Sequence, residues 1–216
     1  FNNRRCLCVF NGVGLLILDA RDGFEIAVQE WDPKYINATI PTIVDNLIFL
    51  NSCYDSGSGL VKIHPTDEPE VIYRLPKRTD HHFANYVLQD GYLYGIEPDT
   101  VHCLEFSTGR EVWAEEAGFG QASLILADGK LIILGSGELA WVDATPEGYR
   151  ECSRFELFSS DYFVPLIASN EKFDDDRKKL AVGSGTFYPP PVLSDGRLYC
   201  RDGDGNLVCL DVRKEN

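Results

Sequence analysis

The densest cluster of titratable side chains in the sequence is Asp80-His81-His82. Imidazole and carboxylate groups are common metal ligands and common general acids and bases. Neighbouring residues of an extended chain point in opposite directions, however, so His81 and His82 are poorly arranged to ligate one metal ion. We therefore expect a polar loop and treat Asp80, His81 and His82 as candidates for binding a ligand or partner. His64 and His102 stand alone within strand-like sequence and are interpreted as ordinary sheet residues.

A second group of potential oxygen ligands, Asp202-Gly203-Asp204-Gly205-Asn206, is similar to the start of a calcium-binding loop. An EF-hand loop has Gly at its sixth position and a bidentate Glu at its twelfth, where this sequence has Leu207 and Arg213. We therefore expect a turn between two strands, with a surface calcium ion as the alternative.

No motif predicts a catalytic nucleophile. The sequence has no Gly-x-Ser-x-Gly, and none of its cysteines has evident activating neighbours. The glycine clusters at 56–59 and 183–185 lack the Lys and Ser or Thr of a phosphate-binding loop. The sequence therefore predicts no catalytic, cofactor-binding or metal-ligating residue.

The composition disfavours several function classes. The 216 residues include 34 acidic and 20 basic side chains, and the formal net charge of −14 disfavours contact with nucleic acid. No apolar stretch approaches the roughly 20 residues of a membrane-spanning helix. The seven cysteines form no C-x-x-C pair and are expected to be small buried side chains.

The sequence around these residues repeats. Hydrophobic runs flank two-residue turns typical of tight β-hairpins, at Asp45-Asn46, Asp90-Gly91, Asp128-Gly129 and Asp195-Gly196. A further run in each unit ends near one of five aligned positions, Asp19, His64, Glu105, Asp143 and Asp211. The intervals of 45, 41, 38 and 68 residues match propeller blades of roughly 40–50 residues, with an insertion before the last blade.

The repeat predicts an all-β fold, a β-propeller of four-stranded antiparallel blades. Five blades are expected, at residues 3–31, 38–75, 82–115, 119–157 and 187–216. The third is the clearest, with strands near 84–89, 92–96, 101–105 and 110–114. The insertion at 158–186 contains the best helical candidate, 171–180.

One segment resembles the pyrroloquinoline-quinone-like (PQQ-like) repeat of a known propeller family. That repeat reads approximately Ala-x-Asp-x-x-Thr-Gly-x-x-x-Trp, and residues 103–113 read Cys-Leu-Glu-Phe-Ser-Thr-Gly-Arg-Glu-Val-Trp. Thr108, Gly109 and Trp113 match in register and are interpreted as structural residues that dock one blade on the next. Other copies are degenerate, with Ala27 or Tyr73 at the position of the Trp.

The resemblance implies a ring of seven or eight blades, of which these five would be the C-terminal part. The sequence starts at Phe1 in strand-like sequence without an initiator Met, so we expect a native start upstream. A self-contained five-bladed ring is the alternative. The resemblance also implies an extracytoplasmic location, periplasmic or secreted, in a bacterium.

The insertion at 158–186 departs most from the repeat and leads into Tyr188 and three prolines. Because loops on rigid scaffolds often carry recognition, Tyr188 is a further candidate for ligand or partner binding at the propeller mouth.

We consider three functions, of which the first two are implied by the resemblance. The first is a non-catalytic binding or protein-interaction scaffold in the bacterial cell envelope, similar to the outer-membrane assembly propellers, with no cofactor. The second is a quinoprotein dehydrogenase that binds PQQ and calcium in the channel, although the Cys-Cys pair typical of these enzymes is absent. The third is a carbohydrate-binding or carbohydrate-active propeller. The expected partner is a protein, small molecule or glycan at the propeller mouth.

Overall fold

Antiparallel β-sheets make up all of the regular structure in the part of the chain that the computed structural model describes. The described residues are 4–32, 37–52, 56–75, 85–97, 99–158, 187, 189–203 and 205–213. Five sheets follow one another along the chain, and we call them blades one to five. Among these residues there is no helix long and apolar enough to cross a membrane.

The strands of the first two blades have the following bounds. Blade one contains β1 (Cys6–Phe10), β2 (Gly14–Asp19) and β3 (Glu25–Glu30). Blade two contains β4 (Thr42–Val44), β5 (Leu47–Ser52), β6 (Gly57–Lys62) and β7 (Glu70–Leu75).

The remaining blades continue the series. Blade three contains β8 (Val87–Gln89), β9 (Tyr92–Glu97), β10 (Thr100–Glu105) and β11 (Glu111–Glu116). Blade four contains β12 (Ala122–Ala127), β13 (Lys130–Gly135), β14 (Glu138–Asp143) and β15 (Glu151–Glu156). Blade five contains β16 (Val192–Ser194), β17 (Arg197–Arg201) and β18 (Leu207–Asp211).

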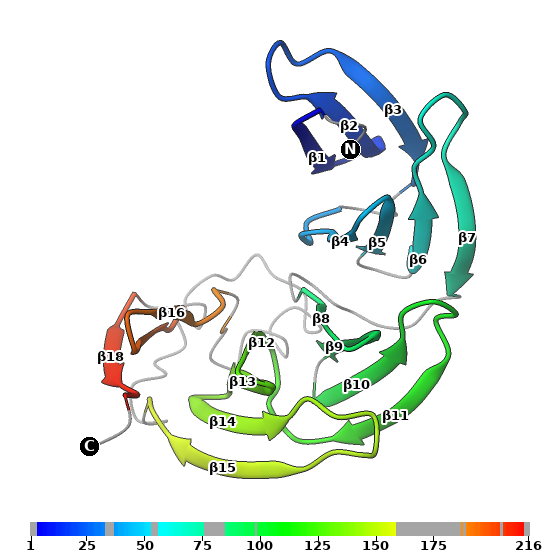
Figure 1. Ribbon diagram of the computed structural model, residues 1–216. Coiled ribbons are helices and arrows are strands. Elements are labelled where there is room, and N and C mark those ends of the chain that lie inside the picture. The colour runs from blue at the N-terminus through cyan, green and yellow to red at the C-terminus, as the bar shows by residue number, and fades with distance from the viewer. Residues whose placement is uncertain are drawn as a thin grey trace, which may run out of the picture.

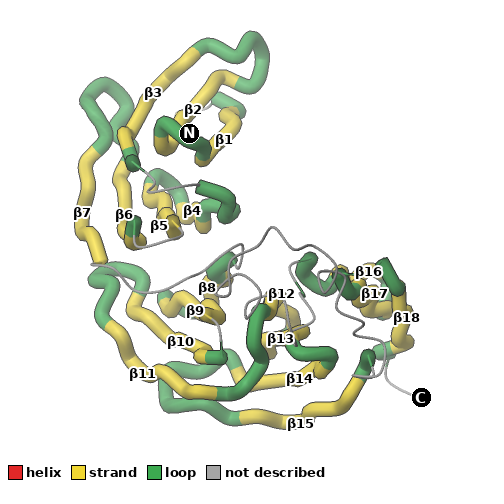
Figure 2. The backbone as a smooth tube through the Cα atoms, turned by 180° about the vertical axis from the view of Figure 1, so that it is seen from behind, coloured by secondary structure: helices red, strands yellow, loops and turns green. Residues whose placement is uncertain are grey.

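The blades stand side by side in an open arc, with the two chain termini at its ends (Figure 1). The first strands β4, β8, β12 and β16 lie on the inner side of the arc, and β3, β7, β11 and β15 form its outer side (Figure 2). The expected propeller of antiparallel blades is therefore confirmed. Blades two, three and four have the predicted four strands, whereas three strands are described in blades one and five.

The two-residue turns between the first and second strands of a blade adopt the predicted backbone. Asp45, Asp90, Asp128 and Asp195 have φ between 48° and 53°, a left-handed conformation that Asp tolerates better than most residues. Glycine follows three of them and also has positive φ, but Asn46 does not. These turns fix the hairpin register, so that the residue before each turn pairs with the residue after it.

The end of the third strand requires one correction. Asp19, Glu105, Asp143 and Asp211 occupy equivalent positions at the ends of β2, β10, β14 and β18, as predicted. The equivalent position in blade two is the residue that pairs with the first residue after the hairpin turn. That residue is Lys62 rather than His64. His64 lies beyond β6, because the sequence alignment followed polar character rather than strand pairing.

Every outer strand with a described partner carries a β-bulge at the same position. The register shifts lie between Ile17 and Leu18, Leu60 and Val61, Cys103 and Leu104, and Trp141 and Val142. A bulge increases local twist, which curves the outer edge of each blade. The repeat therefore includes a backbone irregularity that hydrophobic patterning alone did not reveal.

The hydrophobic core is divided among the interfaces between adjacent blades. Four clusters of buried residues each join two neighbouring blades; for example, Tyr94 and Val101 of blade three pack with Leu131 and Val142 of blade four. Because a sheet of three or four strands cannot bury both faces by itself, this stacking supplies the core.

The expectation of buried cysteines holds only in part. Cys103 and Cys200 are buried, Cys6 and Cys8 are half-buried, and Cys152 and Cys209 are exposed. The candidate helix at 171–180 lies outside the described residues, as does the insertion apart from Phe158.

Candidate functional site

Aromatic side chains on the outer strands reach across to the next blade. Trp113 of blade three donates from Nε1 to the carbonyl of Thr145 in blade four at 2.9 Å. Tyr73 of blade two donates its hydroxyl to the carbonyl of Phe106 in blade three at 2.8 Å. Strand register places the two rings at the same repeat position, which Ala27 occupies in blade one. The same repeat position is thus occupied by Trp in one blade and by Tyr in another, and both side chains make an equivalent hydrogen bond to the next blade.

The turn at Thr108 and Gly109 receives the ring of Tyr73. Gly109 has a φ of 70°, and a Cβ atom there would lie 2.7 Å from side-chain carbons of Tyr73 and Leu75. Thr108 accepts a hydrogen bond from the backbone N–H of Arg110 at 3.2 Å and donates its hydroxyl to Glu105. The contacts of Gly109 and Trp113 support the proposal that they dock adjacent blades, whereas those of Thr108 lie within the turn of blade three.

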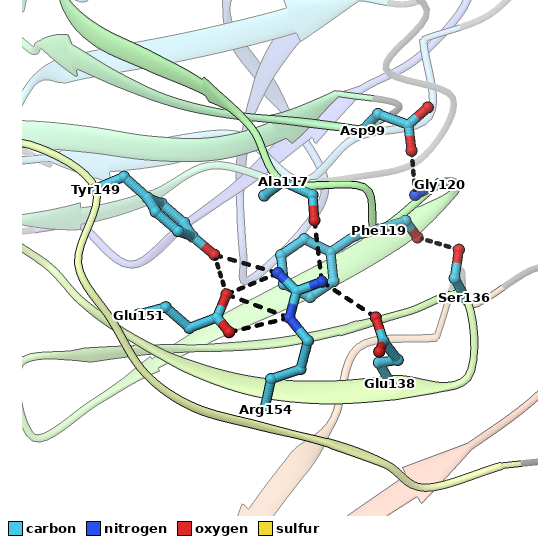
Figure 3. A network of polar contacts seen from close by, with 9 residues as sticks. All are labelled: Asp99, Ala117, Phe119, Gly120, Ser136, Glu138, Tyr149, Glu151 and Arg154. Carbon is cyan, nitrogen blue, oxygen red and sulfur yellow. Dashed lines mark hydrogen bonds and ion pairs between the residues drawn. The ribbon is translucent and has the colours of Figure 1, made fainter.

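A network around Arg154 lies on the blade-three side of blade four (Figure 3). Its guanidinium donates to Glu151 Oε2 at 2.7 Å, to Glu138 Oε2 at 3.1 Å and to the carbonyl of Ala117 at 3.0 Å. The same group lies 4.0 Å above the ring of Phe119, in the loop between β11 and β12. Arg154 therefore ties the outer strand of blade four to the connection that enters it from blade three.

The charges of this network fix the protonation of its members. Burial by itself would lower the pKa of Arg154, but hydrogen bonds with Glu151, Tyr149 and Glu138 outweigh that effect and raise it. The hydrogen bond from Arg154 lowers the pKa of Glu151, while burial and the Glu151 carboxylate raise the pKa of Tyr149. Arg154 therefore stays cationic and Glu151 anionic near neutral pH, and the network is interpreted as structural.

The buried titratable cluster of the described chain is Glu97, His102 and Glu111 in blade three. His102 Nδ1 lies 3.0 Å from Glu111 Oε2, and Nε2 lies 3.4 Å from Glu97 Oε2, within ion-pair range but outside hydrogen-bond geometry. Burial by itself would lower the pKa of His102, but the two carboxylates outweigh it and raise the pKa above its ordinary value. His102 is therefore not the isolated sheet residue that the sequence indicated.

The side of blade two that faces this cluster is also polar. Side chains alternate along a strand, so Asn51 and Ser58 lie on the same face as Phe49 and Leu60, which pack against blade three. Ser58 donates to Asn51 Oδ1 at 2.7 Å, whereas the buried Nδ2 of Asn51 has no hydrogen-bond partner among the described residues. The interface between blades two and three thus combines an apolar layer with buried polar groups.

The sequence-predicted binding residues Asp80, His81 and His82 lie outside the described residues. The connection that contains them leaves β7 at Leu75, which pairs with Ser58, and its described part resumes at Asn85. Their role as ligand-binding residues stays a proposal.

Tyr188 also lies outside the described residues, but both of its neighbours are described. Phe187 is fully buried with the cluster between blades four and five, and the carbonyl of Pro189 accepts a hydrogen bond from Ser123 at 3.1 Å. The entry to blade five is therefore anchored on both sides of Tyr188.

The described residues of the calcium-like segment form the predicted turn between β17 and β18, while Asp204 lies outside the described residues. Both carboxylate oxygens of Asp202 accept hydrogen bonds from Asn206, one from its backbone N–H at 2.7 Å and one from its side-chain amide at 2.6 Å. In the ranges that the structure describes, no three His, Cys, Asp or Glu side chains are placed to hold a metal ion.

The innermost strands carry large apolar side chains in contact with solvent. Ile43 of β4 is 51% exposed and Val192 of β16 is 56% exposed, and Ile40 and Leu193 beside them are exposed as well. Figure 1 places β4 and β16 on the inner side of the arc. We call these four residues the inner-rim patch; two of them lie at the inner edge of blade two and two at the inner edge of blade five. Sequence analysis missed them because exposure on an inner strand depends on the spacing of the blades.

No family model and no curated protein matches this sequence. Solved structures do match. BamB from Moraxella catarrhalis is 13% identical with a TM-score of 0.65, over 98% of this chain and 56% of the BamB chain. The computationally designed Ika8 protein is 11% identical with a TM-score of 0.65, over 97% of this chain and 56% of that one.

A quinohemoprotein alcohol dehydrogenase, ADHIIG from Pseudomonas putida HK5, is 14% identical with a TM-score of 0.55, over 81% of this chain and 32% of the enzyme. The chain thus spans about half of the BamB and Ika8 chains and a third of the dehydrogenase. At these identities the similarity establishes the fold. The chain is a β-propeller segment whose fold is shared by BamB and by quinoprotein dehydrogenases.

Proposed function

We propose that this chain is a non-catalytic binding scaffold of the bacterial cell envelope and that it binds a partner protein at the inner rim of its blades. The inner-rim patch is the observation that carries the proposal. Exposed large apolar side chains that occur in groups mark interaction sites more often than single scattered ones do, and blades two and five each present such a pair. The similarity in fold to BamB, and the resemblance to PQQ-like repeats, support the envelope location.

A quinoprotein activity receives less support from the residues present. Calcium takes six to eight oxygen ligands, and an anionic quinone needs cationic or donor side chains around it. The described first strands β4, β8, β12 and β16 carry Thr42, Gln89, Ser123 and Ser194 as their polar side chains, and their other eleven residues are aliphatic. This donor set does not fit a quinone with a calcium ion.

Site-specific photocrosslinking tests the proposal. A benzoylphenylalanine in place of Ile43 or Val192, introduced into the full-length protein in its native host, should crosslink to one common partner. Ile72, which is 40% exposed on the outer strand of the same blade as Ile43, is the matched control and should not crosslink to it. No adduct at positions 43 and 192, or the same adduct at all three positions, would contradict inner-rim binding.

Cofactor titration separates the scaffold from the dehydrogenase. PQQ and calcium are added to the purified full-length protein, and quinone absorbance and dye reduction are followed. We expect neither a bound-quinone spectrum nor calcium-dependent dye reduction. The appearance of both would replace the scaffold with the enzyme.

A further inference from the structure

A cavity opens between blades one and two, beside the inner-rim patch. Its volume is about 140 Å³. Blade one contributes Cys6, Cys8 and Ile17, and blade two contributes three isoleucines and the turn of Asp45 and Asn46; the isoleucines are Ile43, Ile48 and Ile63. Because Ile43 belongs both to the patch and to the cavity wall, the cavity adjoins the blade-two part of the patch.

The lining selects for an apolar occupant. Aliphatic and thiol side chains make up the wall apart from the turn residues, and burial raises the pKa of the Cys8 thiol to about 11, so that the thiol is neutral. The side-chain amide of Asn46 already donates to the carbonyl of Ile63 at 3.1 Å. An apolar cavity of roughly 150 Å³ holds a molecule the size of benzene, which is comparable with one Leu, Ile or Met side chain.

The rim adds a charge preference. Asp45 is exposed at the edge of the cavity, held by a turn in which its φ is 53°. None of the ion pairs between described residues involves Asp45. With a net charge of −14, the chain as a whole also attracts cationic segments.

We propose that this cavity is the anchor pocket for a partner segment in which an aliphatic side chain is flanked by Lys or Arg. The aliphatic side chain fills the space between Cys8 and Ile43, and the basic residue pairs with Asp45. Buried anchors of this kind dominate binding energy, while a rim charge mainly adds specificity and speed of association. The inference rests on the proposed inner-rim binding and names the chemistry of its partner.

Selection from a displayed library of random seven-residue peptides on the full-length protein tests the pocket. Enriched peptides should carry one Leu, Ile or Met next to Lys or Arg. Cys8→Leu fills part of the cavity with an apolar group and should weaken binding of the selected peptides at least about tenfold. Cys209→Leu places the same change on exposed β18 and should leave binding unchanged.

The charge is tested separately at matched turns. Asp45→Asn removes the carboxylate but keeps a residue that tolerates positive φ. It should weaken binding about threefold to tenfold at low salt and less at high salt. Asp128→Asn, at the equivalent turn of blade four with a φ of 48°, should have no effect. Unfolding midpoints of all four variants show that each is folded.

The outcomes separate this inference from the function on which it rests. Enrichment of acidic peptides, no enrichment, or binding that survives Cys8→Leu overturns the anchor pocket. If the adduct at position 43 persists in the Cys8→Leu protein, inner-rim binding stands without the pocket. A crosslinked dimer at position 43 would identify a second copy of the chain as the occupant and would also overturn the proposed partner chemistry.

Discussion

The interface between blades three and four and the interface between blades two and three share one docking position but differ in the charged groups beside it. Trp113 and Tyr73 make the same cross-blade hydrogen bond in the two interfaces. Beside Trp113 the charged group is Arg154, whose guanidinium is satisfied by several acceptors. Beside Tyr73 the blade-three face carries His102 between two carboxylates.

The difference lies in whether the charge can change. A guanidinium stays protonated at all ordinary pH values, so its interface is held equally well across that range. An imidazole loses its proton near neutral pH, so the interface that contains it depends on pH. The repeat thus conserves the geometry of blade docking while neighbouring blades differ in electrostatics.

Trp113→Ala should have the largest effect on stability. It removes a half-buried indole and its hydrogen bond to Thr145, which should lower the free energy of unfolding by about 3 kcal/mol. Urea denaturation followed by circular dichroism measures the change. Phe155→Ala, an exposed aromatic residue of β15, should cost less; equal losses would mean that cross-blade docking is not what Trp113 supplies.

Arg154→Met should come next, at about 2 kcal/mol, because it leaves Glu138 and Glu151 without their partner. Its control is Arg150→Met in the same blade. Arg150 pairs with Glu147 where both side chains are more than half exposed, and its removal should cost well under 1 kcal/mol. Similar losses in the two variants would show that the Arg154 network is no stronger than a surface ion pair.

Gly109→Ala tests the interface between blades two and three at its turn. The new methyl group meets both a positive φ and the Tyr73 ring, so we expect a loss of about 2 kcal/mol. Gly23 occupies the same turn of blade one with a φ of 75° and open space around its Cβ position. Gly23→Ala should therefore cost only the backbone strain, about 1 kcal/mol. Equal losses of unfolding free energy for Gly109→Ala and Gly23→Ala in chemical denaturation would show that Gly109 does not dock the blades.

His102→Gln should give the smallest effect and one that depends on pH. Because the pKa of His102 is raised in the folded protein, its contribution is complete below the unfolded-state value of 6.5 and is lost as pH rises through the folded-state value. The stability difference between wild type and His102→Gln should thus be largest near pH 5–6 and shrink toward pH 9. A difference that stays constant across this range would place the pH response elsewhere.

Local sequence signals predicted the repeating framework well. The Asp-Gly turns identified the hairpins, and the repeat in residues 103–113 aligned Trp113 with Tyr73, which strand register places at the same repeat position. The end of the third strand in blade two was wrong by two residues, because His64 was aligned by polarity whereas backbone pairing selects Lys62. The β-bulges, which no residue type marks, were not anticipated.

The candidate sites could be predicted less well from the sequence. Glu97, His102 and Glu111 come from three strands, and only the hairpin register brings them together. Arg154 lies in β15 and Phe119 in the loop between β11 and β12, so they too are brought together only by the packing of the blades. The sequence-predicted residues Asp80, His81, His82 and Tyr188 stay proposals, since they lie outside the described residues.

By itself, the sequence determined the repeated pattern of strands and hairpin turns, because turn conformation and side-chain alternation are encoded within a few residues. Only the tertiary structure decided what the blades present to one another and to solvent. The cavity beside Ile43 and the charges around His102 and Arg154 arise where separate sheets meet, and burial, pKa and cavity shape are properties of that packing rather than of any single segment.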